Sequence, residues 1–176
     1  MDPDAYLCQL AEIFNGISVN TPSLSAIIAI ILAGLLLLAS GFASASEIAF
    51  FSLSPSDLND IEEGNHPSDG KISNLLADSE RLLATILITN NFVNVTIIML
   101  CNFFFMNVFV FHSPLAEFLI LTVILTFLLL LFGEIMPKIY SAQKTLAFCR
   151  FSAPVIYVVR KVFAPGSAVL VHSTAF

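Results

Sequence analysis

Residues 115–133 read LAEFLILTVILTFLLLLFG and continue directly into EIMPK at 134–138. The hydrocarbon core of a bilayer needs about 20 apolar residues to be crossed by a helix, so this stretch predicts a transmembrane span. Two residues at its end are unexpected in hydrocarbon. The Glu134 carboxylate is costly there unless it is paired, protonated or bound to a cation, and Pro137 breaks helices. Either the membrane ends at Gly133 or Glu134 has a function within it.

The composition of the whole chain is typical of a membrane protein. Of its 176 residues, 57% are hydrophobic and 11% are charged, whereas soluble domains carry about 25% charged residues. Two further apolar stretches are long enough to cross a bilayer, which places the three spans at about 23–53, 82–111 and 115–137. The predicted fold is therefore an all-α membrane protein. A formal net charge of −6 gives no indication of a basic surface for binding nucleic acid.

The positions of the basic residues predict the orientation of the chain. All seven lie between the first two spans or after the third: Lys71, Arg81, Lys138, Lys144, Arg150, Arg160 and Lys161. Because loops rich in Lys and Arg remain in the cytoplasm, these segments are expected inside. Residues 1–22 are then an extracytoplasmic N-terminal segment, and the expected location is the cell inner (cytoplasmic) membrane.

The segment between the first two spans predicts short helices. Ser54 or Ser56 is a candidate N-cap for a helix that Gly64 ends, and a second helix is expected from about Lys71 to Arg81. Both helices are expected to lie against the cytoplasmic membrane face. Their apolar contacts would be Leu58, Ile61, Leu75 and Leu76.

The region after the third span, residues 145–176, mixes aromatic and basic residues. Pro154 and Pro165 are expected to interrupt it. Three basic residues spread through an otherwise apolar segment favour juxtamembrane interfacial helices over a fourth span. The membrane domain proper is accordingly predicted to cover residues 23–144.

Each predicted span carries oxygen-bearing side chains that hydrocarbon should exclude. Ser40, Ser44 and Glu47 fall on one helical face, with Ser46 beside it, while Asn90 and Asn94 share a face of the second span next to Thr89 and Asn91. The third span adds Glu134. On the first helix, small residues four apart predict close helix packing at Gly41, Ala45 and Ala49.

The third group also has a backbone component. In an α-helix, Pro137 cannot donate to the carbonyl four residues earlier, which is that of Gly133. An unsatisfied carbonyl in lipid needs a partner, and a cation is one such partner. Hard divalent cations, magnesium above all, prefer oxygen ligands of this kind.

Other interpretations of these residues stay open at this point. Ser and Asn in transmembrane helices often only hydrogen-bond neighbouring helices, and Glu134 with Lys138 could form an i,i+4 pair that marks the membrane boundary. Three cysteines and three histidines are scattered without zinc-ligand spacing: Cys8, Cys101, Cys149, His66, His112 and His172. An intramembrane hydrolase using Ser44 or Ser46 is disfavoured, because no His or Lys base lies at the same depth.

Three segments together resemble a known family. SASEIAFFSLSPSDL (44–58), ERLLATILITNNFVN (80–94) and GEIMPK (133–138) resemble the transmembrane domain of the CorC/CNNM magnesium transporters, the DUF21 domain. The resemblance extends from about residue 24 to 165. The chain departs from the family pattern at Thr89, where the family has glycine, which leaves the neighbouring Asn90 in place.

The resemblance implies a homodimer embedded in membrane lipids that transports Mg²⁺, with Co²⁺ as another cargo and Na⁺ as a coupling ion, through an inward-facing site. Carried over by position, the implied metal ligands are Ser44, Ser46, Asn90, the Gly133 carbonyl and Glu134. Supporting or coupling-ion roles fall to Glu47, Asn91, Asn94, Pro137 and Lys138.

The resemblance also bears on partners and on rival functions. Family members usually continue into paired CBS modules that bind adenine nucleotide. No such cytosolic region is present, so an isolated or truncated membrane domain is expected. No enzymatic activity is expected. A Mg²⁺-binding scaffold or sensor that does not transport is the alternative function.

Overall fold

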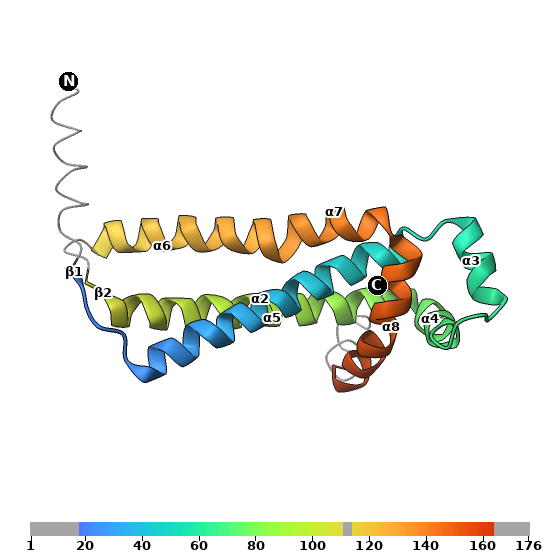
Figure 1. Cartoon of the computed structure of the whole chain (residues 1–176), viewed down its shortest axis with the longest axis horizontal. Helices are drawn as coiled ribbons and strands as arrows, with labels where there is room; N and C mark the ends of the chain where they lie inside the picture. The colour runs from blue at the N-terminus through green and yellow to red at the C-terminus, as the bar shows by residue number, and fades with distance from the viewer. Residues whose placement is uncertain (1–17, 111–113, 164–176) are drawn as a thin grey trace, which may run out of the picture.

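The computed structural model describes residues 18–110 and 114–163, and in these residues it is built almost entirely of helices. Three long rods run side by side (Figure 1). The first is α2 (Leu24–Phe51) and the second is α5 (Ser79–Val108). The third joins α6 (Pro114–Leu128), the π-helical segment η1 (Leu129–Ile135) and α7 (Met136–Gln143). Within these described ranges, three helices are long and apolar enough to cross a membrane, which agrees with the three predicted spans.

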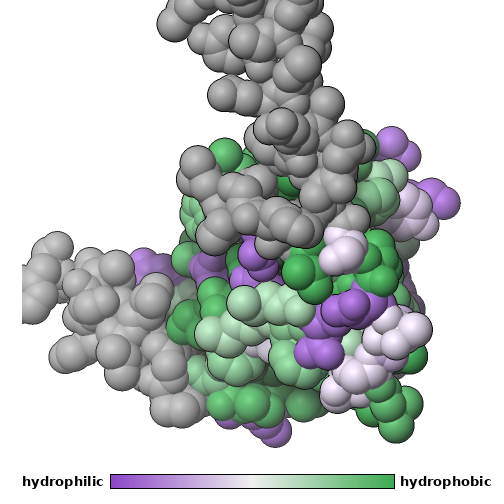
Figure 2. All heavy atoms as spheres, turned by 90° about the vertical axis from the view of Figure 1, so that its left-hand side faces the viewer, coloured by the Kyte–Doolittle hydropathy of each residue, from purple (hydrophilic) through white to green (hydrophobic). Residues whose placement is uncertain are grey.

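One end of the bundle, the β end, carries a short two-stranded sheet. Strand β1 (Ser18–Val19) pairs antiparallel with β2 (Phe109–Val110), and the Asn20 N–H donates to the Val108 carbonyl at 2.7 Å. Strands of two residues are too short for an alternating pattern to reveal them in the sequence. Figure 2 looks onto this end, where large hydrophobic areas lie beside scattered hydrophilic residues.

The opposite end, the α3–α4 end, carries two short helices. Helix α3 (Pro55–Glu62) begins at the predicted cap: the Ser54 hydroxyl accepts from the Asp57 N–H, and the Asp57 carboxylate accepts from the Ser54 N–H. Past its end, Gly64 has φ +69°, a conformation that favours glycine. The sequence therefore predicted this helix correctly.

The second short helix differs from its predicted bounds. Helix α4 covers Asp69–Leu76 and does not reach Arg81. The reason is Asp78, whose carboxylate accepts from the Arg81 N–H and so starts α5 as a new helix.

Helix α8 (Thr145–Val162) crosses the bundle near the α3–α4 end (Figure 1). Its helix continues through Pro154, so the expected interruption at that residue is wrong. The lost backbone bond is offset by packing, because one face of α8 is buried against the bundle through Cys149, Ser152, Ala153 and Ile156. Pro165, like Cys8, His112, His172 and most of residues 1–22, lies outside the described residues.

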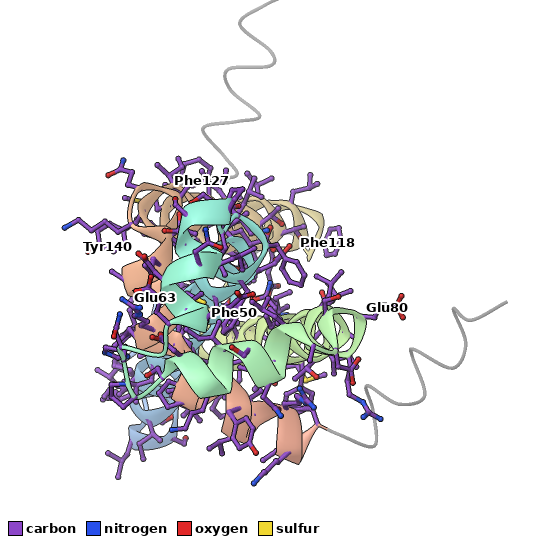
Figure 3. The ribbon with its side chains drawn as sticks, turned by 90° about the vertical axis from the view of Figure 1, so that its right-hand side faces the viewer. Phe50, Glu63, Glu80, Phe118, Phe127 and Tyr140 are labelled. Atoms are coloured by element: carbon purple, nitrogen blue, oxygen red, sulfur yellow. The ribbon has the colours of Figure 1, made fainter. Side chains whose placement is uncertain are left out.

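The main hydrophobic core lies at the α3–α4 end. Phe50 lies inside this end in Figure 3 and is 2% exposed. Ile61 and Leu75 are buried in the same cluster, and Leu76 packs against it. Three of the four residues expected to contact the membrane face therefore contact protein instead, and Leu58 alone of the four is exposed. The short helices extend the core because each is long enough to bury one apolar face.

A partly buried ion pair fastens α4 to α8. The Asp69 side chain is 1% exposed, and the Arg150 guanidinium donates to its two carboxylate oxygens at 2.8 and 3.1 Å. The His66 N–H donates to the same carboxylate at 2.9 Å. Above all, the Arg150 hydrogen bonds lower the pKa of Asp69 from its ordinary value. Because the charged form is the one stabilised, the pair adds stability above the unfolded-state pKa of about 3.9.

We expect Asp69→Asn to destabilise the detergent-solubilised protein by about 2 kcal/mol at neutral pH, the scale of hydrogen bonds to a charged group. The wild type should lose that difference as the pH falls through the lowered pKa of Asp69, since protonation then removes the same charge. Thermal unfolding at several pH values measures both effects. Glu62→Gln, on the exposed end of α3, is the matched control. Equal melting temperatures for Asp69→Asn and wild type at pH 7 would contradict this account.

Candidate metal centre

The polar residues of two spans meet at Ser40, in the middle of the bundle. The Ser40 hydroxyl lies 2.8 Å from Asn90 Oδ1 and 2.6 Å from Asn94 Oδ1, and Ser40 is fully buried. A hydroxyl has one proton to donate. It can therefore donate to only one of the two amide oxygens at a time. The site brings a buried hydroxyl and two side-chain amides of neighbouring spans into contact.

The third rod approaches this group through two glycine contacts. A Cβ on Gly133 would lie 3.2 Å from Ser40 Oγ, and a Cβ on Gly41 would lie 3.0 Å from Pro137 Cγ and 3.2 Å from the Phe132 carbonyl oxygen. Further along, the Ser141 hydroxyl donates to the Ala45 carbonyl at 2.6 Å. The close packing predicted from Gly41 and Ala45 is thus confirmed, and the partner is η1 with α7.

Ser44 and Ser46 behave differently. The Ser44 hydroxyl is buried and has no hydrogen-bond partner, alone among the buried side-chain polar atoms of the described residues. The Ser46 hydroxyl donates to the Phe42 carbonyl of its own helix at 2.7 Å. Residues two apart on an α-helix point in nearly opposite directions, about 160° apart, and no hydrogen bond joins Ser46 to the Asn90 group. Ser44 is therefore the serine with unused bonding capacity, and a ligand role for Ser46 stays a prediction.

The π-helical register of η1 changes the argument about the free carbonyl. The Met136 N–H donates to the Leu131 carbonyl, five residues earlier. In this register the N–H that Pro137 lacks would serve the carbonyl of Phe132, whereas the α-helical register pointed to Gly133. The expected position of the proline-freed carbonyl therefore moves from Gly133 to Phe132, and a free carbonyl there stays a prediction. In the sequence, a proline after an apolar run indicated a carbonyl without its helical donor. Nothing in the sequence indicated the π-helical register.

The charged residues near the site form one ion pair that the sequence did not single out. Lys138 Nζ lies 3.2 Å from Glu47 Oε2, with both side chains about one third exposed (34% and 32%). The i,i+4 pair between Lys138 and Glu134, which was one of the open interpretations, is not formed. Within the described part of the chain, Glu134 is half-buried and has neither a hydrogen bond nor an ion pair.

The remaining predicted residues lie at the edge of the site. Asn91 is exposed, and Thr89 donates to the Thr85 carbonyl of its own helix at 2.7 Å. Among residues 18–110 and 114–163, no three His, Cys, Asp or Glu side chains come together as a metal site. Any cation held here would therefore depend on hydroxyl, amide and carbonyl oxygens with the single carboxylate of Glu134.

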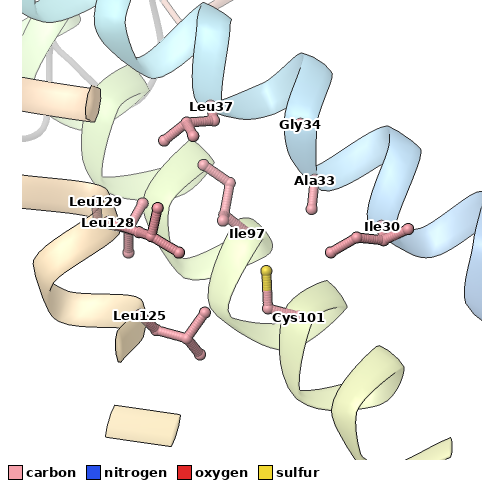
Figure 4. Close-up of a pocket in the computed structure, with 9 residues that line it drawn as sticks. All are labelled: Ile30, Ala33, Gly34, Leu37, Ile97, Cys101, Leu125, Leu128 and Leu129. Carbon is pink, nitrogen blue, oxygen red and sulfur yellow. The ribbon is translucent and has the colours of Figure 1, made fainter. Parts of the chain in front are cut away.

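An apolar cavity of about 200 Å³ lies next to the site, toward the β end. Side chains of α2, α5, α6 and η1 line it, among them Leu37, Ile97 and Leu129 (Figure 4). Leu37 also lies 3.5 Å from the position of a Cβ on Gly133, so it separates the cavity from the polar group. The cavity offers no oxygen side chain to a cation.

Comparison with known proteins identifies the family. Residues 30–176 match the CNNM family, described as the cyclin M transmembrane N-terminal domain. The chain belongs to the CNNM family. The CNNM chain is also 31% identical over 129 residues to a UPF0053 protein of Haemophilus influenzae, an alignment that covers 73% of the chain and 30% of that relative. The chain thus spans under one third of the length of this curated relative.

The CNNM domain family is associated with divalent cation transport. With its three apolar helices, the CNNM chain is a multi-pass membrane protein.

Proposed function

We propose that this chain binds a divalent cation, Mg²⁺ in the first place and Co²⁺ as a further cargo, and moves it across the membrane. The observation that carries the proposal is a buried, unpartnered hydroxyl, that of Ser44, one helical turn from a cluster of oxygen-bearing side chains. In that cluster the Ser40 hydroxyl lies 2.8 and 2.6 Å from the amide oxygens of Asn90 and Asn94. Buried polar groups normally have partners, and a hard cation would supply one to several oxygens at once.

The proposed ligands are Ser44, Asn90, Glu134 and a carbonyl of the Phe132–Gly133 segment, with Ser46 as a further candidate. Ser40 and Asn94 add oxygens to the same group, and the Glu47–Lys138 pair supports the neighbouring backbone. One carboxylate leaves a Mg²⁺ ion with net positive charge, so the ion is held moderately and retains water, as Mg²⁺ does in proteins. Moderate binding is what a transported ion requires.

The basic residues and the apolar cavity support an orientation for the transport cycle. The α3–α4 end carries most of the basic residues, so we place it in the cytoplasm of a cell inner membrane, with the N-terminus outside. Because the cavity toward the β end has no ligands, the site is proposed to open toward the cytoplasm. A homodimer and coupling to Na⁺ complete the proposal, on the strength of the family resemblance.

Ser44→Ala should weaken Mg²⁺ binding at least tenfold without destabilising the fold. The substitution breaks no hydrogen bond, and it removes a buried hydroxyl that has no partner. Isothermal titration calorimetry with Mg²⁺ measures the affinity, and thermal unfolding without metal measures stability. Ser46→Ala is the comparison: an unchanged affinity there excludes Ser46 as a ligand. Full affinity in Ser44→Ala would refute the proposed site.

Flux measurements separate a transporter from a scaffold or sensor. Purified protein in liposomes that contain a Mg²⁺-sensitive dye should produce flux that Ser44→Ala reduces in parallel with affinity. Binding that is lost in Ser44→Ala, combined with no flux in the wild type, would instead assign the site to a non-transporting scaffold or sensor.

Pro137→Ala tests the backbone ligand. The new N–H can serve the Phe132 carbonyl in the π register or the Gly133 carbonyl in the α register. Either bond uses up an oxygen that the cation needs, so we expect a several-fold loss of Mg²⁺ affinity by calorimetry with every side-chain ligand intact. Pro154→Ala in α8 is the matched control and should bind as wild type. Equal affinities in the two variants would rule out a carbonyl ligand.

A further inference from the structure

A groove at the junction of α7 and α8 carries the features of a lipid-binding site. It has a volume of about 260 Å³ and is lined by Tyr140, Lys144, Ala147, Phe148 and Phe151. The aromatic walls are open to the surroundings: Tyr140 is 61% exposed and lies at the edge of the molecule in Figure 3, and Phe151 is 66% exposed. The groove thus combines one cation with a mainly apolar lining.

Lys144 is one of two basic residues that have no partner in the described part of the chain, and the only one of the two that lines the groove. Arg81, Lys138 and Arg150 form ion pairs, Arg160 donates to a backbone carbonyl and Lys161 lies over an aromatic ring. Within the described residues, only Lys71 and Lys144 have no carboxylate, carbonyl or ring as partner. Lys71 lies on α4 and does not line the groove. Lys144 is therefore a free cation in an apolar groove.

The position of α8 favours a place for this groove at the membrane surface. The third span ends at Gln143, directly before Lys144. Opposite its buried face, α8 exposes apolar side chains at intervals of four, three and four residues: Phe151, Val155, Val158 and Val162. This spacing puts them on one helical face. A helix with an exposed apolar face and basic residues beside it lies in the headgroup region of a bilayer.

We propose that the groove binds one anionic phospholipid. The ammonium group of Lys144 pairs with the headgroup phosphate, the Tyr140 hydroxyl donates a hydrogen bond to it, and an acyl chain lies along Phe148 and Phe151. Charge complementarity selects an anionic lipid, because Lys144 has no acid of its own and a zwitterionic headgroup brings its own cation. A tyrosine at this depth is typical of the membrane interface.

The full chain in detergent, titrated with phosphatidylglycerol and observed by native mass spectrometry, tests the proposal. Lys144→Gln should weaken the first lipid-binding event about fivefold, which corresponds to about 1 kcal/mol per basic residue near an anionic surface. Lys144→Arg should bind as wild type, and so should the matched control Lys71→Gln. Phosphatidylcholine with the same acyl chains should bind the wild type more weakly than phosphatidylglycerol does. The two lipids should bind Lys144→Gln equally. Equal losses in Lys71→Gln and Lys144→Gln would show diffuse attraction only and overturn the site.

A photo-crosslinking residue in place of Ala147 identifies what occupies the groove. Illumination in phosphatidylglycerol nanodiscs should yield a lipid adduct, and soluble glycerol phosphate should not compete for it, because the acyl chain contributes to binding. A chain-to-chain adduct would assign the groove to a second copy, and competition by glycerol phosphate would assign it to a free phosphate. Either result would overturn the proposal.

Discussion

The Glu134→Gln protein is expected to lose the rise in melting temperature that Mg²⁺ gives the wild type. A ligand that binds only the native state stabilises it by about 2.7 kcal/mol at 100 times its dissociation constant, and the only carboxylate proposed as a ligand is that of Glu134. Glu134 has no hydrogen bond or ion pair within the described residues, so its replacement breaks no structural contact. Stability without metal should therefore be unchanged or higher.

The choice of control follows from the ion pairs. Lys138→Gln would break the contact with Glu47 and so change the neighbouring structure. Glu117→Gln is the better match, because Glu117 belongs to the same rod near the β end and is far from the polar group. It should keep the full Mg²⁺ effect in differential scanning fluorimetry. If Glu134→Gln also keeps it, Glu134 marks the membrane boundary and is not a ligand.

Gly41→Ala is expected to destabilise the protein by about 1–3 kcal/mol, the usual cost of overpacking. The added methyl group would lie 3.0 Å from Pro137 Cγ and 3.2 Å from the Phe132 carbonyl oxygen. Neither can move independently, since one belongs to a ring fixed to the backbone and the other is the backbone itself. The substitution should also weaken Mg²⁺ binding, because it pushes η1 away from Ser40.

Gly34→Ala on the same helix is its matched control. Nothing lies within 4 Å of the added methyl group at Gly34, and alanine favours the helix over glycine by up to about 1 kcal/mol. We expect thermal unfolding to show a neutral or stabilising effect there. Equal melting temperatures for Gly41→Ala and Gly34→Ala would show that stability does not depend on the close approach of α2 to the third rod.

Sequence patterns predicted those features that depend on local chemistry. Apolar length identified the spans, and the Ser54 cap with Gly64 identified α3. The end of α4 was missed because the Asp78 cap competes with a continuous helical pattern. Pro154 was misjudged for a different reason: tertiary packing of α8 outweighs a local preference.

The site was predictable in its residue types and only in part in its geometry. The Ser40 face was visible as a pattern, but its role as the meeting point of Asn90 and Asn94 depends on the packing of α2 against α5. The contact between Glu47 and Lys138 likewise joins two spans and is invisible in either one. The expected position of the free carbonyl moves to Phe132 because of the π register, which no local pattern encodes.

The Asp69–Arg150 pair has a consequence for the order in which the protein is assembled. Its partners are 81 residues apart, with two spans between them. Asp69 is synthesised before the second span, and Arg150 only after the third. Contacts of such long sequence separation form late, because the intervening chain must first be brought together. Until the third span and Arg150 have been synthesised, the carboxylate that fastens α4 therefore has only the local His66 N–H as a partner. The contact between α4 and α8 can close only after the whole helical bundle has been made.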